Sequence, residues 1–201
     1  KRAIIPLAGF GTRMFPATKS LKKGFLPILD HDGLLKPALL IMLEQLEDAG
    51  IEEIALVIGE EDQEVYDGLF APLSEAVTEK LSEEKRAYAR RLLGLREKLT
   101  YICQRERLGF GHAVYQCREF TQNEAAILLL GDMIYRTGAQ ENCCRQIMDA
   151  YTECGKALVG LQEVPLSRVV HYGILGGHWD DAAERLLIVE SMVEKPTDDY
   201  A

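Results

Sequence analysis

Short apolar runs alternate along the chain with amphipathic segments, and this alternation limits the possible folds more than any other feature. Each run is apolar along nearly its whole length, as expected of a strand buried on both faces of a sheet. Strands that alternate with helices pair in parallel through right-handed crossovers. We therefore expect an α/β fold with a three-layer, doubly wound (Rossmann-like), mostly parallel sheet. The expected strands are residues 3–8, 54–58, 99–103, 126–130 and 157–164.

Helical patterns fill the intervals between these runs. Residues 37–49 begin with proline and are followed by Gly50, which matches the usual start and stop of a helix. Residues from about 73 to 95 carry apolar side chains every three to four positions and predict one or two surface helices. The remaining expected helices are residues 111–120 and 139–154.

The C-terminal part of the chain has a different pattern. Residues 172–177 and 185–194 predict two strands joined by the polar stretch 178–184, so we expect a small antiparallel β element near the C-terminus. Because no repeat or low-complexity linker interrupts the sequence, we expect a single domain over residues 1–201. The chain stops in a polar stretch with no closing element before it, so we expect that domain to be truncated at its C-terminus.

The charge balance and the apolar runs exclude several classes of protein. The chain has 23 Lys and Arg residues against 32 Asp and Glu residues, a net charge of −9, which argues against a nucleic-acid partner. No apolar run approaches the roughly 18 to 20 residues that a membrane span needs. Gly9, Gly11 and Arg13 interrupt the first apolar run, so the N-terminus does not predict a secretory signal. The sequence therefore predicts a cytoplasmic protein with no membrane partner.

The cysteines predict neither a disulfide framework nor a zinc site. They are odd in number and lack the Cys-x-x-Cys spacing that zinc sites and redox motifs use. We interpret them as small buried thiols. They are Cys103, Cys117, Cys143, Cys144 and Cys154.

A glycine-rich turn, Leu7-Ala8-Gly9-Phe10-Gly11-Thr12-Arg13, follows the first expected strand. Such a turn lets backbone N–H groups approach phosphate oxygens, because no Cβ intervenes. It is neither a dinucleotide fingerprint, which needs glycine in place of Met14, nor a Walker loop. Residues 1–23 hold six cationic side chains and no acidic one. A basic loop alone is usually a solvated surface, but the glycine turn beside it favours a triphosphate site.

Five motifs occur in register along the chain. The first is Gly9-x-Gly11-Thr12-Arg13-x-x-Pro16-x-Thr18, followed by Lys23 and Pro27. The others are Gln104 with residues 108–114 (LGFGHAV), Leu130-Gly131-Asp132, Glu163-Val164-Pro165 with Tyr172-Gly173-Ile174, and Val193-Glu194-Lys195-Pro196. Together they resemble the sugar-phosphate nucleotidyltransferases, and within that family the bacterial uridylyltransferases that act on UTP and glucose 1-phosphate.

The resemblance implies a reaction in which a sugar 1-phosphate oxygen attacks the α-phosphorus of UTP and pyrophosphate leaves. The attacking oxygen is anionic at neutral pH, so the site needs alignment and charge neutralisation and not a general base. The resemblance implies UTP, glucose 1-phosphate and UDP-glucose as partners and Mg²⁺ as cofactor. The oligomeric state stays open, a homo-oligomer included.

The resemblance also assigns roles to individual residues. Asp132 is the expected Mg²⁺ ligand, because it follows a buried strand and emerges at the edge where open sheets bind ligands; the alternative is an aspartate that only caps a loop. His112 is interpreted as a structural residue in the first turn of a helix. The implied catalytic residues are Arg13, Lys23 and Asp132. The implied nucleotide-binding residues are Ala8, Gly9, Gly11, Thr12, Gln104 and Gly111, with Gln104 and Gly111 at the uracil. The implied sugar-phosphate-binding residues are Gly173, Glu194 and Lys195.

The chain departs from the family pattern at five places, one of which is a short insertion over residues 31–35 before Lys36-Pro37. Lys22-Lys23-Gly24 replaces Pro-Lys-Glu, and Gly59-Glu60-Glu61-Asp62 replaces Gly-Arg-x-Lys. Met133 stands where many relatives carry a second acid, and the family's second metal-binding aspartate would follow Lys195-Pro196. Two alternatives therefore stay open. One is a transferase for another nucleotide or sugar 1-phosphate, and the other is a nucleotide-sugar-binding regulatory module without turnover. A dinucleotide-dependent oxidoreductase is disfavoured by Met14.

Overall fold

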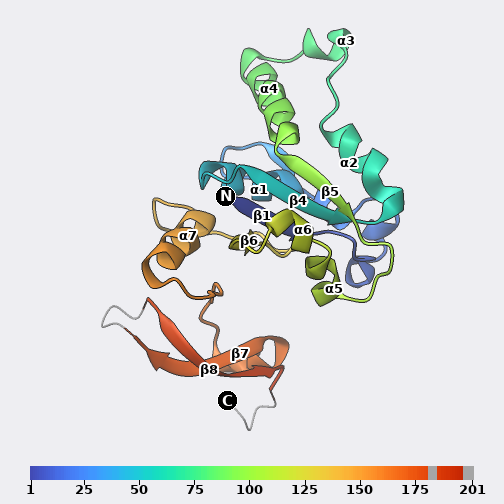
Figure 1. Ribbon diagram of the computed structural model, residues 1–201. Coiled ribbons are helices and arrows are strands. Elements are labelled where there is room, and N and C mark those ends of the chain that lie inside the picture. Colours follow the sequence, from blue (N-terminus) through green and yellow to red (C-terminus); the bar gives the residue numbers. More distant parts are fainter. Residues whose placement is uncertain (181–184, 197–201) are drawn as a thin grey trace. The chain divides into compact units, whose positions relative to one another are not determined.

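Four parallel strands form the main sheet in the order β5-β4-β1-β6 (Figure 1). The computed structural model describes residues 1–180 and 185–196. The strands are β1 (Arg2–Pro6), β4 (Glu53–Ile58), β5 (Leu99–Cys103) and β6 (Ala126–Leu128). All three pairings between them are parallel. Four of the five expected strands are therefore confirmed, with β1 at the centre.

Helices cover both faces of this sheet and give the expected three layers. Ile5 and Leu56 face one core, whereas their neighbours Ile4 and Val57 face a second, smaller one. This alternation follows from the two-residue period of a strand. The larger core is covered by α1 (Ala38–Asp48), α2 (Gln63–Leu69), α4 (Glu83–Glu97) and α7 (Cys143–Cys154), and the smaller one by α5 (Phe110–Tyr115) and α6 (Arg118–Thr121). The prediction of a doubly wound α/β fold is confirmed.

Two helix predictions change in detail. The segment 73–95 contains α3 (Glu75–Thr78) and α4, in agreement with one or two helices. The segment 111–120 is divided into α5 and α6. Helix α7 begins later than expected, at Cys143, because the Asn142 side chain caps it by accepting a hydrogen bond from the Arg145 N–H at 2.9 Å.

The prediction of a strand over residues 157–164 is wrong. These residues form no strand, and most of them are exposed. An apolar run specifies a side-chain pattern, but a strand also needs a neighbouring strand to accept its backbone hydrogen bonds. Within the described residues, the main sheet ends at β6 on that side and pairs with none of them.

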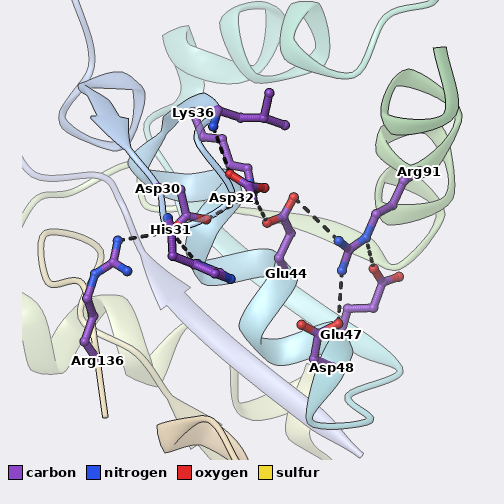
Figure 2. A network of polar contacts seen from close by, with 10 residues as sticks. Asp30, His31, Asp32, Lys36, Glu44, Glu47, Asp48, Arg91 and Arg136 are labelled. Carbon is purple, nitrogen blue, oxygen red and sulfur yellow. Dashed lines mark hydrogen bonds and ion pairs between the residues drawn. The ribbon is translucent and has the colours of Figure 1, made fainter. Parts of the chain in front are cut away.

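A small hairpin that the sequence did not predict follows the glycine-rich region. It consists of β2 (Pro27–Leu29) and β3 (Leu35–Pro37), which pair antiparallel. Lys36 of β3 is 3% exposed, and its ammonium lies 3.0 Å from Asp30, 2.6 Å from Asp32 and 2.8 Å from Glu44 of α1 (Figure 2). This ion network fixes the hairpin to the first helix. Strands of three residues are too short for their period to be recognised in the sequence.

The described chain divides into two compact units, Lys1–Leu158 and Val159–Ala201. The second unit contains β7 (Gly173–Trp179) and β8 (Leu187–Glu194), which pair antiparallel with a register shift between Gly176 and Gly177. The expected antiparallel element is therefore confirmed. Among the described residues, no helix has the length and apolar character that crossing a membrane requires.

The interpretation of the cysteines as buried thiols holds for two of the five. All five are free; Cys117 and Cys144 are buried, whereas Cys103 is exposed. Burial raises the pKa of Cys117 to about 11 and that of Cys144 to about 12, so both thiols stay protonated at neutral pH. Neither is a nucleophile in the ground state.

Candidate active site

The carboxyl ends of β1 and β6 lie side by side at the point where the chain reverses its direction across the sheet. From β1 the chain moves through α1 to β4 on one side, and it returns through α5 and α6 to β6 on the other. Open α/β sheets bind ligands at such a switch point. The glycine-rich turn follows β1 and Asp132 follows β6, so both motifs meet at this edge.

The glycine-rich turn is braced by its own backbone and by Thr18. Gly11 has a φ of 69°, in the left-handed region, and a Cβ at this position would lie 2.9 Å from Cγ2 of Thr18. The Thr18 hydroxyl donates a hydrogen bond to the Gly11 carbonyl at 3.0 Å. Glycine is therefore required at position 11, whereas Gly9 faces open space. The turn presents backbone at the edge of the sheet, as a phosphate-binding loop must.

The other predicted residues of this turn differ in exposure. Ala8 is buried and Thr12 is exposed in η1 (Thr12–Met14). The backbone of Arg13 belongs to the same 3₁₀ turn. The Arg13 side chain lies outside what the structure describes, so its predicted contact with the triphosphate stays a prediction.

Lys23 and Asp132 are brought into direct contact. The Lys23 ammonium donates a hydrogen bond to Oδ2 of Asp132, and the two groups form an ion pair. Gly131 allows the contact between Lys23 and Asp132. A Cβ at position 131 would overlap the Pro6 carbonyl oxygen and lie 2.6 Å from Cδ2 of Leu7. The close approach of the backbone at Gly131 thus sets Asp132 beside the end of β1. Two of the residues expected to act on the phosphates share one site.

Lys22 is directed to a different partner from Lys23. Its ammonium forms an ion pair with Asp62, which is 2% exposed and lies in η4 (Glu60–Asp62) after β4. Gly24 is buried in η3 (Lys23–Phe25), where a Cβ would lie 3.5 Å from Leu39. The segment around Lys23 is therefore held on both sides. The missing family proline at position 22 does not leave it loose.

Gln104 lines a cavity of about 300 Å³ at the same edge of the sheet. Its side chain is buried, and its backbone N–H donates to the Ile58 carbonyl at 2.9 Å. Gly111 faces open space near the start of α5, as expected if a flat base needs room there. Of the other predicted nucleotide-binding residues, none lines this cavity. The cavity is lined by Phe10, Glu60, Glu61, Gln104, Arg105 and Arg107.

One wall of the cavity is made by residues that the sequence analysis did not single out as functional. The Arg107 guanidinium lies 4.2 Å from the centroid of the Phe10 ring and forms an ion pair with Glu61. A hydrogen bond from its own backbone N–H and the Arg107 charge lower the pKa of Glu61. A Cβ at Gly59 would lie 2.6 Å from Nη2 of Arg107, so the guanidinium packs closely against this glycine. Arg107 thus joins the glycine-rich turn to the segment after β4.

Several of these contacts involve residues at which the sequence departs from the family pattern, and those departures are the sequence signal for them. Acidic residues replace the family's Gly-Arg-x-Lys stretch, and each of the three has a basic partner. Asp62 pairs with Lys22, Glu61 with Arg107, and Glu60 with Arg105 at 3.9 Å. The acidic segment therefore connects the two sides of the cavity.

A divalent cation bound to the substrate phosphates would meet the carboxylate of Asp132, which follows β6. Among the residues that the structure describes, no group of three or more His, Cys, Asp or Glu side chains could hold a metal ion. Asp132 alone is compatible with Mg²⁺, which is commonly bound through one or two carboxylates and substrate phosphates. The residues present fit a cation whose other ligands come from the substrate.

The three predicted sugar-phosphate residues gather at one end of the C-terminal hairpin. Gly173 of β7 pairs with Glu194 of β8, and a Cβ at Gly173 would lie 3.1 Å from Oε2 of Glu194. Lys195 follows with a φ of 49°, and its backbone N–H donates to the Tyr172 carbonyl at 3.0 Å. A left-handed backbone at a lysine is strained and is frequently found at functional sites.

Comparisons with known proteins agree with one another. The family described as nucleotidyl transferase matches residues 2–201. The UTP–glucose-1-phosphate uridylyltransferase of Staphylococcus haemolyticus (strain JCSC1435) is 37% identical over 201 residues, covering 98% of this chain and 65% of that protein. A UDP-glucose pyrophosphorylase complexed with UDP-glucose has a TM-score of 0.81 at 28% identity, covering 100% of this chain and 71% of that one. A UTP-bound enzyme from Acinetobacter baumannii has a TM-score of 0.80 at 25% identity, covering 100% and 70%. The chain thus spans 65% of the length of the Staphylococcus protein.

Proposed function

Because the chain belongs to the nucleotidyl transferase family, we propose that it transfers the uridylyl group of UTP to glucose 1-phosphate. A phosphate oxygen of glucose 1-phosphate forms a bond to the α-phosphorus of UTP. The bond from that phosphorus to the bridging oxygen of pyrophosphate breaks, so the products are UDP-glucose and pyrophosphate. The observation that carries this proposal is the contact of Lys23 with Asp132 at the switch point between β1 and β6.

Lys23 supplies positive charge where the reaction develops negative charge. Its side chain is only partly exposed and its ammonium is paired with the Asp132 carboxylate, so it needs little reorganisation when UTP binds. A preorganised cation of this kind stabilises the transition state more than the ground state. Arg13 acts on the same triphosphate in this proposal.

Asp132 holds the divalent cation that is typical of nucleotidyl transferases, and we propose Mg²⁺. The cation, when bound, neutralises charge on the phosphates. The Asp132 carboxylate, which pairs with Lys23 in the structure, would hold this cation together with oxygens of the substrate phosphates.

The cavity beside Gln104 receives the uracil ring. Gln104 has a side-chain amide that can pair with the imide edge of uracil, and Gly111 leaves room for the flat base. The backbone of Ala8, Gly9, Gly11 and Thr12 then follows the ribose and phosphates. Nothing in this arrangement requires a general base.

Gly173, Glu194 and Lys195 bind glucose 1-phosphate in this proposal. Their clustering at one end of the β7–β8 hairpin supports a shared role, with Glu194 accepting hydrogen bonds from sugar hydroxyls and Lys195 binding the phosphate. We also place the protein in the cytoplasm, because the proposed substrates are charged metabolites.

The test is release of pyrophosphate by the purified full-length protein with Mg²⁺. UTP, dTTP, CTP, ATP and GTP are each offered with glucose 1-phosphate and with galactose 1-phosphate, and the sugar nucleotide is identified by mass spectrometry. We expect turnover with UTP and glucose 1-phosphate to exceed every other pair. Binding of UDP-glucose in a calorimeter without turnover for any pair would instead establish a regulatory module.

A further inference from the structure

The orientation of the Gln104 amide is determined by its neighbours. Its nitrogen, Nε2, donates to the Gly109 carbonyl at 3.1 Å and lies 3.0 Å from Nδ1 of His112. A backbone carbonyl only accepts hydrogen bonds, so the nitrogen and not the oxygen of the amide must face it. Within the part of the chain that the structure describes, the amide oxygen Oε1 has no hydrogen-bond partner and is not sealed from solvent. The free end of the Gln104 side chain is therefore an acceptor at the cavity.

The same contacts determine which nitrogen of His112 carries the proton. Nδ1 receives an N–H from Gln104, so Nδ1 is the unprotonated nitrogen of a neutral ring. The proton then resides on Nε2, which lies 2.8 Å from Nε2 of Gln116. A protonated ring nitrogen needs an acceptor, so we assign the Gln116 amide in the flipped orientation, with its oxygen toward His112. Gln104, His112 and Gln116 thus form one directed chain of hydrogen bonds.

We propose that His112 is a positioning residue for nucleotide selection. It holds the Gln104 amide so that Oε1 accepts a hydrogen bond from the N3–H of uracil. This inference rests on the proposed function, in which Gln104 contacts the base. Uracil carries a hydrogen on N3, whereas cytosine has an unprotonated N3 that can only accept. The orientation that the Gly109 carbonyl and His112 hold together therefore favours UTP over CTP. Thymine has the same N3–H as uracil, so this contact does not separate UTP from dTTP.

A matched pair of substitutions at position 112 tests the role of Nδ1. The side-chain oxygen of asparagine can occupy the place of Nδ1, whereas the longer glutamine amide reaches the place of Nε2. His112→Asn should keep the acceptor for Gln104, and His112→Gln should withdraw it. We expect His112→Gln to raise KM for UTP and to lower the UTP-to-CTP ratio of kcat/KM by about fivefold, the effect of losing one orienting hydrogen bond. kcat at saturating UTP should change little, because His112 does not contact the proposed phosphate-binding residues Lys23 or Asp132.

The outcomes separate this inference from the function on which it rests. If the unaltered protein neither binds nor turns over UTP, the proposed function fails. If Gln104→Leu loses the preference for UTP but His112→Gln keeps the original UTP-to-CTP ratio, the function stands and the role of His112 is refuted. Equal losses for His112→Asn and His112→Gln would assign His112 to packing alone and would also refute it. Thermal unfolding of each variant shows that the comparison is made between folded proteins. Gln116→Glu keeps an acceptor for Nε2 of His112 and should retain the UTP-to-CTP ratio of kcat/KM.

Discussion

Lys23 and Asp132 form an ion pair that joins two segments 109 residues apart in sequence. Further along both segments, the Arg136 guanidinium donates a hydrogen bond to Asp30 at 3.0 Å, so the two segments meet a second time (Figure 2). Asp30 is in turn bound to the buried Lys36. The geometry at the sheet edge is thus maintained by contacts outside it. Substitution of Lys23 or Asp132 should therefore change chemistry more than folding.

Asp132→Asn should remove magnesium-dependent turnover and leave the protein folded. The amide keeps the size of the carboxylate but loses the charge that binds the cation and pairs with Lys23. We would measure kcat against Mg²⁺ concentration, with near-ultraviolet circular dichroism as the control for folding. Turnover at limiting Mg²⁺ equal to that of the unaltered protein would show that Asp132 is not the metal ligand.

Lys23→Ala should lower kcat about a hundredfold to a thousandfold and change UTP affinity much less. Loss of one preorganised transition-state contact costs about 2.7 to 4 kcal/mol, and an interaction made mainly in the transition state affects kcat. Steady-state kinetics and calorimetric binding of UTP measure the two quantities separately. An unchanged kcat would show that another cation neutralises the developing charge.

Lys22 should not replace Lys23 in that role. The Lys22 ammonium is bound to the buried Asp62, so the loss of Lys22 should loosen the segment around Lys23 instead of removing a substrate contact. We expect Lys22→Met and Asp62→Asn each to destabilise the protein, with a coupling of about 1 kcal/mol or more in the double variant. Urea unfolding of the four proteins gives this coupling. Independent, additive effects would show that the ion pair contributes nothing.

Much of the fold could be predicted because its signals are local. Residues 54–58 are apolar throughout, and their burial on both faces of the sheet makes that pattern obligatory. The β2–β3 hairpin was missed because its three-residue strands are stabilised by Lys36, Asp30 and Glu44, whose contact is visible only in three dimensions. The strand expected over residues 157–164 has the right composition but no pairing partner among the described residues.

The candidate site could be predicted where it depends on chain order. Residues that follow parallel strands meet at one edge, so Gly11 and Asp132 could be assigned together. The contacts of Arg107 with Phe10 and of Asp62 with Lys22 depend on side chains from separate loops. No local pattern reports such contacts. Of these two contacts, only that of Asp62 with Lys22 joins positions at which the chain departs from the family pattern.

Gly131→Ala should destabilise the protein and lower its activity, whereas Gly68→Ala should stabilise it. A Cβ at position 131 would overlap the Pro6 carbonyl oxygen, and relief of that overlap must displace Asp132. We expect a loss of about 1 to 3 kcal/mol of stability, as for other overpacked sites. Gly68 lies in α2 with open space around it, so alanine there should gain about 1 kcal/mol through helix propensity. Urea unfolding measures both, and a Gly131→Ala variant of unchanged stability and activity would show that the close approach to Pro6 is not needed.

Lys36→Met should be strongly destabilising at neutral pH. The ammonium is almost fully buried among Asp30, Asp32 and Glu44, and its removal takes away the one cation that these three carboxylates share. Breaking a buried pair by removing one partner costs about 3 to 5 kcal/mol. Lys80→Met is the matched control, since Lys80 is exposed, and it should stay within about 0.5 kcal/mol of the unaltered protein. Urea unfolding at pH 7 provides the comparison.

The same network predicts how stability depends on pH. Burial opposes ionisation of Asp30, but hydrogen bonds from Lys36 and from the His31 backbone outweigh it and hold the pKa of Asp30 well below its usual range. A carboxyl with a lowered pKa in the folded state contributes stability above its unfolded pKa, about 3.9, and loses it as the pH falls further. Lys36 stays charged throughout that range, so the loss reports on the carboxylates. We expect the unfolding free energy to fall between pH 5 and pH 2.5, and to fall less steeply in Lys36→Met, whose Asp30 no longer has that partner. Parallel curves for the two proteins would show that the Lys36 network does not contribute to acid sensitivity.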